Sequence, residues 1–221
     1  MKAVLFDLDG TLIDTAPDLY LALSKTLEGE GKAAISYAQA RTQVSNGAAA
    51  MIADAFAIER DDPEFARLTQ TLLDHYSSHI YQDSQYFDGL GELLDWFDQH
   101  KVPWGIITNK PERFTTPLLE GFGIDKRSHI TLCPEHVSQP KPHPEPMWLA
   151  SKSLGLEASD CIYVGDHARD IESGKAANMM TIAALWGYLD EGPTSTAPWG
   201  ADHAVSDPRQ LKPLLETLLA V

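Results

Sequence analysis

Two aspartates near the start of the chain, Asp7 and Asp9, are placed to act together on a substrate. They follow the apolar run 4–6, and side chains two positions apart on an extended segment project to the same side. Crowded carboxylates repel unless a cation or a shared proton relieves them, and Gly10 permits a tight turn after the pair. Asp-Gly is also a common turn pair, but the unbroken apolar strand leading into it favours a functional site.

Groups suited to binding a phosphate oxygen occur further along the chain. The segment Thr108-Asn109-Lys110 closes a second apolar run, where a hydroxyl and the following backbone N–H can hold such an oxygen, although the same residues also suit a helix cap. Lys141 stands between Pro140 and Pro142, which restrict the backbone and position the lysine. The plainer alternative is an exposed lysine in a proline-rich loop.

A second pair of carboxylates, Asp166 and Asp170, follows Gly165 after a further apolar run. Oxygen ligands suit Mg²⁺, which takes few protein carboxylates and keeps several waters. The alternative is a helix start with Asp170 near its first turn. Together the four segments hold the groups needed for metal-assisted phosphoryl transfer, provided that the fold brings them together.

The elements that must position these side chains are the strands of a parallel sheet. Short apolar runs alternate with helical patterns, which predicts an α/β fold with a doubly wound, mainly parallel sheet. All four segments then fall at the carboxyl ends of successive strands, where ligands bind in such sheets. The predicted strands are 3–8, 103–108, 130–133, 160–165 and 180–185, and the predicted helices between them are 90–99, 111–122, 144–154 and 170–177.

The stretch between the first two predicted strands breaks this alternation, because its pattern is helical almost throughout. We therefore predict a helical cap domain, 15–81, inserted into a catalytic core made of 1–14 and 82–221. After a first cap helix that Asp14 or Thr15 can cap, the predicted cap helices are 39–44, 48–56 and 65–79. Outside the cap, a surface loop rich in proline and glycine is predicted at 192–200.

The composition of the chain limits the binding partners and the cellular compartment that we expect. The chain has 221 residues and a net charge of −15, which repels nucleic acid and anionic membranes. It lacks the run of about 18 apolar residues that a membrane-spanning helix needs, and Asp7 comes too early for a signal peptide. Two cysteines without a Cys-x-x-Cys pair fit a reducing compartment and argue against zinc. We expect a cytoplasmic protein that acts on a small phosphorylated metabolite, without nucleic-acid or membrane partners; its oligomeric state stays open.

The order of these motifs resembles the haloacid dehalogenase superfamily of phosphatases over essentially the whole chain. The segments 6–15 and 108–111 are typical of its phosphoglycolate phosphatase branch. The resemblance implies a Rossmann-like core with an inserted helical cap and Mg²⁺-dependent hydrolysis of a small phosphate monoester. The residues that carry it are, in order, Asp7-Leu8-Asp9-Gly10-Thr11, Thr108, Lys141, and Gly165-Asp166 with Asp170.

The resemblance also implies a role for each matching residue. Asp7 would be the nucleophile that forms an aspartyl-phosphate, and Asp9 would protonate the leaving alcohol and then activate water. Thr108 and the N–H of Asn109 would bind the transferring phosphoryl group, and Lys141 would neutralise charge beside it. The implied Mg²⁺ ligands are Asp7, the backbone carbonyl of Asp9, and Asp166, with Asp170 supporting the water shell of the metal.

Two features bear on the substrate. Many relatives in the phosphoglycolate phosphatase branch carry serine where this chain has His167, and the segment 44–50 contains a glycine in a cap loop that faces the substrate in related enzymes. In these two features the chain is similar to a bacterial subgroup of phosphatases that acts on N-acetylmuramic acid 6-phosphate. That ester, another sugar phosphate and 2-phosphoglycolate all stay open as substrates. His167 could contact substrate or cap, or lie at the surface, and Arg41 could contact an anion or face solvent.

Other activities compete with hydrolysis. A sugar phosphomutase differs only in whether water or a second hydroxyl attacks the aspartyl-phosphate, and the sequence leaves it open. A haloacid dehalogenase would not need Asp9, since halide leaves without a proton. A phosphonate hydrolase would need a cap lysine, and Lys25 and Lys32 have no evident support for that role. A phospho-accepting receiver places its aspartate mid-chain, and a non-catalytic binding module is expected to lose one of Asp7, Asp9, Lys141 or Asp166.

Overall fold

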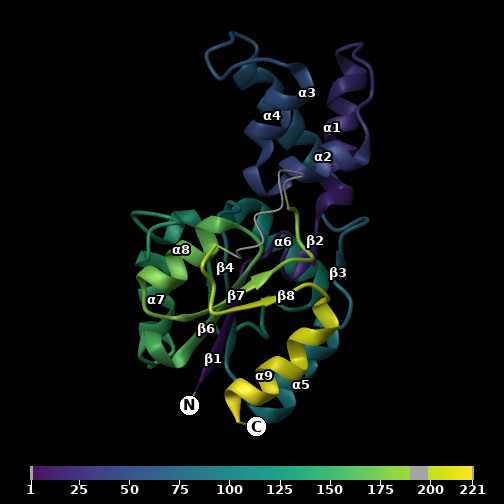
Figure 1. Cartoon of the computed structure of the whole chain (residues 1–221). Helices are drawn as coiled ribbons and strands as arrows, with labels where there is room; N and C mark the ends of the chain where they lie inside the picture. Colours follow the sequence, from purple (N-terminus) through teal and green to yellow (C-terminus); the bar gives the residue numbers. More distant parts are fainter. Residues whose placement is uncertain (1, 190–198, 221) are drawn as a thin grey trace.

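The computed structural model describes residues 2–189 and 199–220, and a parallel six-stranded sheet lies at its centre (Figure 1). The strands are β1 (Ala3–Phe6), β4 (Trp104–Ile107), β5 (Thr131–Leu132), β6 (Cys161–Gly165), β7 (Met180–Ala184) and β8 (His203–Val205). Their order across the sheet is β5-β4-β1-β6-β7-β8, and every neighbouring pair is parallel. β1 is therefore central, with β4 and β6 on its two sides.

Helices cover both faces of this sheet. They are α5 (Leu90–His100), α6 (Glu112–Phe122), α7 (Glu145–Ser153), α8 (Ala168–Ala176) and α9 (Leu211–Leu219). Val4 and Phe6 of β1 join a hydrophobic cluster with α5, α6 and α9, whereas Ala3 and Leu5 join a second cluster with α7. All four side chains are fully buried, because a central parallel strand is covered on both faces.

A separate group of helices stands over the carboxyl edge of the sheet (Figure 1). It consists of α1 (Ala16–Gly29), α2 (Tyr37–Gln43), α3 (Ala48–Phe56) and α4 (Phe65–Ser77), with a 3-10 turn at Val44–Asn46. These helices bury a hydrophobic cluster of their own, which includes Leu23, Ile52 and Leu72. Phe114 and Tyr188 from the rest of the chain pack into the same cluster, so the helical group is docked on the sheet domain.

Two chain crossings connect the helical group to the sheet domain. β2 (Ile13–Asp14) and β3 (Gln85–Tyr86) pair antiparallel at these crossings. The fully buried carboxylate of Asp18, in the first turn of α1, accepts the backbone N–H of Asp83 at 2.8 Å and the hydroxyl of Ser84 at 2.6 Å. The entering and leaving segments are thus fastened to each other, which fixes where the helical group stands over the sheet.

The fold class predicted from the sequence is confirmed, and each predicted strand is present. The prediction lacks β2, β3, β8 and α9, since the three strands are too short, at two or three residues, to show periodicity. Most of the predicted loop 192–200 lies outside the described residues, and the cap bounds 15–81 stay a prediction. None of the helices in the described part of the chain has the length together with the apolar character that a bilayer crossing demands.

Candidate active site

The four predicted segments meet at the carboxyl edge of the sheet. Asp7 follows β1, Thr108 follows β4 and Asp166 follows β6, so the three residues come from adjacent strands. Lys141 reaches the same place from the loop before α7, and Asp170 reaches it from the first turn of α8. Carboxylate oxygens of the three aspartates in this cluster lie within 4.8 Å of one another. The convergence that the sequence predicts is therefore present.

Lys141 is a buried cation shared between two carboxylates. Its Nζ lies 2.9 Å from Oδ1 of Asp7 and 2.7 Å from Oδ1 of Asp170. It also donates to the carbonyl oxygen of Ile107 and to the hydroxyl of Tyr163, at 2.9 and 2.8 Å. Burial opposes the charged ammonium, but the two carboxylates outweigh that effect and raise the pKa of Lys141. The lysine is therefore a fixed positive charge beside Asp7.

Asp166 is held by hydrogen bonds from three parts of the chain. Its Oδ1 accepts the hydroxyl of Thr11 at 3.1 Å, and its Oδ2 accepts the backbone N–H of Tyr188 at 2.9 Å. The hydroxyl of Ser45 also donates to Oδ2, at 3.2 Å, so the helical group contacts this carboxylate directly. Gly10 leaves the necessary room, because a Cβ there would lie 2.2 Å from Oδ2.

Burial and charge repulsion raise the pKa values of the carboxyl groups of Asp7 and Asp166. Burial raises the pKa of Asp7 to about 6, although Lys141 opposes the shift and Asp170 adds to it. Burial, followed by the negative charges of Asp7 and Asp170, raises the pKa of Asp166 to about 7. Both groups therefore hold their protons to a higher pH than ordinary carboxyl groups, and added positive charge would favour their ionised forms.

Asp7, Asp166 and Asp170 could hold a divalent cation. Carboxylate oxygens are hard ligands of the kind that such cations take. Lys141 pairs with Asp7 and Asp170 rather than with Asp166, so a cation would supply the positive charge that Asp166 lacks. Asp170 engages both of its oxygens, with Lys141 and with the backbone N–H of His167 at 3.1 Å. We therefore expect Asp170 to support the cation site through these contacts rather than to bind the cation directly.

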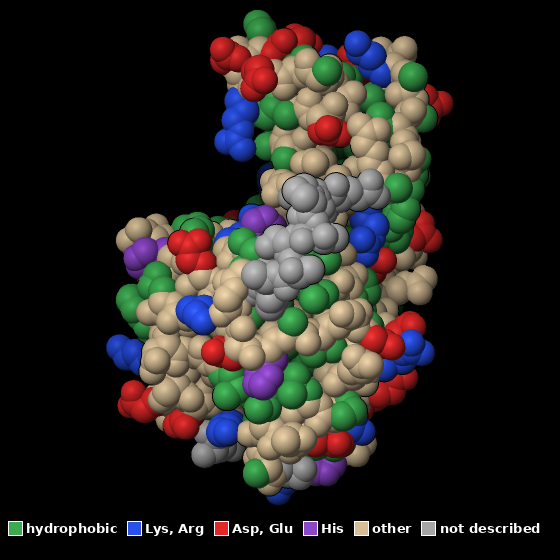
Figure 2. All heavy atoms as spheres, viewed as in Figure 1, with side chains coloured by type: hydrophobic (Ala, Val, Ile, Leu, Met, Phe, Trp, Pro, Cys, Tyr) green, Lys and Arg blue, Asp and Glu red, His purple; other side chains and the backbone are tan. Residues whose placement is uncertain are grey.

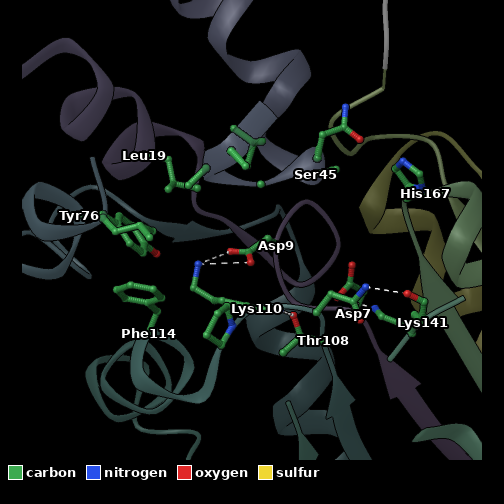
Figure 3. A pocket seen from close by; sticks show the side chains of 18 of the residues that line it. Asp7, Asp9, Leu19, Ser45, Tyr76, Thr108, Lys110, Phe114, Lys141 and His167 are labelled. Carbon is green, nitrogen blue, oxygen red and sulfur yellow. Dashed lines mark hydrogen bonds and ion pairs between the residues drawn. The ribbon is translucent and has the colours of Figure 1, made fainter. Parts of the chain in front are cut away.

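Asp9 is engaged by partners outside the acidic cluster (Figure 3). Its Oδ1 accepts the hydroxyl of Thr15 at 2.5 Å, and its two oxygens lie 3.0 and 3.3 Å from Nζ of Lys110. The side chain keeps 18% of its surface exposed and lines a cavity. Asp7 and Asp9 thus occupy different environments, which suits two carboxyl groups for different roles.

Thr108 and Asn109 lie where a phosphate group could be bound. Oγ1 of the buried Thr108 accepts the N–H of Lys110 at 3.0 Å, so its hydroxyl hydrogen can be donated elsewhere. Nδ2 of Asn109 donates to the carbonyl oxygen of Lys141 at 2.8 Å, which ties the lysine loop to the end of β4. Both residues line the same cavity as Asp9.

The cavity has a volume of about 340 Å³ and lies between the sheet edge and the helical group. Figure 2 shows the molecule hollowed on one side between these two parts. The rings of Tyr76 and Phe114, 5.5 Å apart, lie on one side of Asp9, and Ser45 and His167 lie on the other (Figure 3). The floor is polar and is formed by Asp7, Asp9, Thr108, Asn109 and Lys141, whereas the apolar wall is formed by Leu19, Leu73, Tyr76 and Phe114.

Two residues with open roles are placed by the structure. Arg41 donates to the carbonyl oxygen of Gly187 at 3.0 Å, and its guanidinium lies 4.8 Å from the centre of the Tyr188 ring. It therefore joins α2 to the loop after β7, and it is not part of the cavity wall in the described chain. His167 does line the cavity, and its Nδ1 accepts the N–H of the residue two positions later at 3.1 Å.

Several residues that contact the site have no role in the sequence analysis, among them Lys110, Tyr163 and Ser45. Lys110 pairs with Asp9; the sequence analysis names it in the Thr108-Asn109-Lys110 segment but assigns it no role. Tyr163 lies within a strand that is predicted only as apolar. Ser45 lies in the segment 44–50 that the sequence analysis singles out, but its contact with Asp166, 121 positions away, could not be predicted from local sequence.

Comparisons with known proteins agree with this geometry. A family model described as haloacid dehalogenase-like hydrolase matches residues 4–184. The N-acetylmuramic acid 6-phosphate phosphatase of Pseudomonas aeruginosa is 42% identical over 99% of this chain and 96% of the relative. The phosphoglycolate phosphatase of Xanthomonas campestris pv. campestris is 40% identical over 95% of this chain and 94% of the relative.

A crystal structure described as a predicted phosphoglycolate phosphatase from Haemophilus somnus superposes with a TM-score of 0.85. It is 25% identical in sequence, and the match covers 97% of this chain and 98% of the other. The chain therefore belongs to the haloacid dehalogenase-like hydrolase family, and it is a phosphatase.

Proposed function

We propose that this phosphatase hydrolyses a phosphorylated amino sugar acid, N-acetylmuramic acid 6-phosphate, through a phosphoryl group carried on Asp7, with Mg²⁺ as the bound cation. The observation that carries the proposal is the cluster of Asp7, Asp166 and Asp170 around the buried Lys141. The cluster lies beside a cavity that Asp9 also lines, so a nucleophile and a proton donor face the same space.

Asp7 is the nucleophile in this proposal. The N–H of Leu8 and the ammonium of Lys141 both reach Oδ1 of Asp7, at 2.7 and 2.9 Å, so we assign the attack on phosphorus to Oδ2. A bond from Oδ2 to phosphorus forms while the bond from phosphorus to the ester oxygen breaks. Covalent transfer of this kind replaces one difficult step with two easier ones.

Asp9 moves the protons in both steps. In the first step it gives its proton to the departing alcohol oxygen. In the second step it takes a proton from the water that attacks phosphorus, which releases inorganic phosphate and restores the Asp7 carboxylate. The different partners of the two aspartates support this division of roles.

The transferring phosphoryl group would be bound by the hydroxyl of Thr108, the N–H of Asn109 and the ammonium of Lys141. A divalent cation held by Asp7, Asp166 and the backbone carbonyl of Asp9 would neutralise charge where an anionic carboxylate meets an anionic phosphate. Fixed donors of this kind stabilise charge without reorganising during the reaction.

The cavity supports a sugar phosphate as the substrate. Pockets for molecules of drug size have volumes of about 300–1,000 Å³, and this cavity, at about 340 Å³, suits an amino sugar better than a two-carbon acid. Its wall of Leu19, Leu73, Tyr76 and Phe114 offers apolar contact to a ring. The relative from Pseudomonas aeruginosa supports the same substrate by its name. Phosphoglycolate is the second candidate, which the relative from Xanthomonas campestris supports.

Release of free phosphate from a panel of esters tests the proposal. We expect N-acetylmuramic acid 6-phosphate to have a higher kcat/KM than phosphoglycolate and glucose 6-phosphate, and a metal chelator to stop turnover until Mg²⁺ is restored. Replacing Mg²⁺ by Ca²⁺ should inhibit, because Ca²⁺ takes a larger and looser coordination shell. An isomerised ester without free phosphate would identify a mutase instead. Turnover unchanged by the chelator would contradict the metal assignment.

A further inference from the structure

A second buried cation lies in the cavity, and the proposed mechanism assigns it no step. Lys110 exposes only 6% of its side chain, compared with 1% for Lys141. Its backbone is fixed at two points, because its N–H donates to Oγ1 of Thr108 at 3.0 Å and its carbonyl accepts the hydroxyl of Thr115 at 3.2 Å. The lysine is thus anchored between the phosphate-binding end of β4 and the start of α6.

The ammonium of Lys110 lies between the proposed proton donor and the helical group. Nζ is 3.0 Å from Oδ1 and 3.3 Å from Oδ2 of Asp9, and it lies 4.6 Å from the centre of the Tyr76 ring (Figure 3). Tyr76 belongs to α4 and is 1% exposed, with Phe114 packed against it. A cation over an aromatic face is attracted by the ring, so Lys110 contacts the two parts of the molecule that enclose the cavity.

The contacts of Asp9 indicate what the lysine does there. The hydroxyl of Thr15 reaches only Oδ1, whereas Lys110 reaches both oxygens. With Thr15 alone, the carboxyl group could turn about that single contact. Lys110 removes this freedom, and a small misplacement of a reacting group is costly for rate.

We propose that Lys110 is a positioning residue: it holds the carboxyl group of Asp9 toward the departing alcohol oxygen, and the ring of Tyr76 holds Lys110 in turn. Protonation of the leaving group then depends on the helical group being docked over the site. The inference rests on the proposed function, because it takes Asp9 as the proton donor.

Stability alone does not account for this pair. The cost of removing two charges from water offsets most of their attraction, so buried ion pairs contribute little net stability. Asp9 keeps 18% of its side chain exposed, so water can solvate it when the lysine is removed. We therefore expect Lys110→Met to fold, which makes its kinetics informative.

The test compares two esters that differ in their need for a proton. A sugar phosphate releases a weakly acidic alcohol that must be protonated, whereas p-nitrophenyl phosphate releases a stable phenolate. The readout is kcat/KM, which reports the first transfer step because departure of the alcohol is irreversible. Loss of acid catalysis typically costs about 10²–10⁴-fold. Lys110→Met should lower kcat/KM by about 100-fold or more for N-acetylmuramic acid 6-phosphate and by less than about 10-fold for p-nitrophenyl phosphate. The exposed Lys152→Met is the matched control and should change neither value.

Two variants of Tyr76 test the link to the helical group. Tyr76→Phe keeps the ring beside the ammonium, so the ratio of its kcat/KM values for the two esters should match that of the wild type. Tyr76→Leu removes the ring and should lower kcat/KM selectively for the sugar ester, by less than Lys110→Met does, and not through a rise in KM alone, which loss of apolar contact with the sugar would cause. Equal losses on both esters in Tyr76→Leu would overturn the link.

Asp9→Asn separates failure of the inference from failure of the proposed function. We expect it to show the same selective loss as Lys110→Met. If Asp9→Asn is selective but Lys110→Met lowers kcat/KM equally for both esters, or raises KM alone, the inference is overturned and the proposed function stands. If Asp9→Asn lowers kcat/KM equally for both esters, Asp9 is not the proton donor, and both the inference and the proposed function are overturned.

Discussion

Nζ of Lys141 lies 2.7 Å from Oδ1 of Asp170, and the two side chains have 1% and 0% of their surfaces exposed. The pair joins the loop before α7 to the first turn of α8 at the floor of the site. It also fixes the lysine where it reaches Asp7, at 2.9 Å. A buried pair of this kind adds little net stability, but removing one partner leaves an uncompensated charge.

Replacing Lys141 with methionine should therefore lower the free energy of unfolding by about 3–5 kcal/mol and abolish phosphate release. Urea denaturation in the presence of a chelator measures the first effect, without a bound cation to mask it. The double variant Lys141→Met/Asp170→Asn should recover part of the stability but none of the activity. A single variant as stable as the wild type would show that the pair is not formed as described.

The contribution of Asp7 and Asp166 to the stability of the chelated protein should fall as the pH rises from about 4 to about 7. Asp7 and Asp166 have folded-state pKa values raised to about 6 and about 7, against 3.8 as their ordinary value. Over that interval these two groups bind more protons in the folded state than in the unfolded chain, so their contribution to stability falls with pH. Mg²⁺ should raise the melting temperature more at pH 8 than at pH 5, because it binds the ionised carboxylates. Thermal denaturation at a series of pH values checks both effects.

Asp166→Asn is the control for this pH dependence, since it removes one of the two shifted groups together with the repulsion between that group and Asp7. Between pH 5 and 7.5 its melting temperature should fall less, or rise more, with pH than that of the wild type. A wild-type stability that rises more steeply than that of Asp166→Asn over this range would contradict the shifts.

Gly10→Ala should impair the metal site. Gly10 has φ of +83°, and an added Cβ would lie 2.2 Å from Oδ2 of Asp166. Gly123 is a matched control, because its φ is +67° but an added Cβ would meet nothing within 4 Å. Both variants should lose about 1–2 kcal/mol from the left-handed backbone. Only Gly10→Ala should also weaken Mg²⁺ binding, measured by titration calorimetry. Equal Mg²⁺ affinity in the two variants would show that the contact with Asp166 is relieved without consequence.

The sheet and its motif residues could be predicted because the signals are local. A fully buried parallel strand such as β1 is an unbroken apolar run, and Asp7 and Asp166 stand directly after such runs. The rule that ligands gather at the carboxyl edge then brings distant positions together. The short strands β2, β3 and β8 cannot be predicted in this way, because two or three residues are too few to show a pattern of apolar residues.

Contacts between the helical group and the sheet domain could not be predicted. Ser45 and Arg41 reach the core only because α2 and the turn after it dock over the sheet, and that arrangement depends on packing that no local pattern encodes. Lys110 is visible in the sequence, but its pairing with Asp9 depends on two strand ends lying side by side. The substrate depends on the cavity wall, which the helical group completes.

The most direct test of the account is to trap the phosphoryl group on Asp7. Asp9→Asn should still accept a phosphoryl group from p-nitrophenyl phosphate, whose phenolate leaves without a proton, but it should release that group slowly because water is no longer activated. Mass spectrometry of the acid-quenched protein should then find one phosphoryl group on the peptide that contains Asp7, and none in Asp7→Asn. A phosphoryl group on a different residue, or turnover of p-nitrophenyl phosphate by Asp7→Asn at near the wild-type rate, would contradict the account.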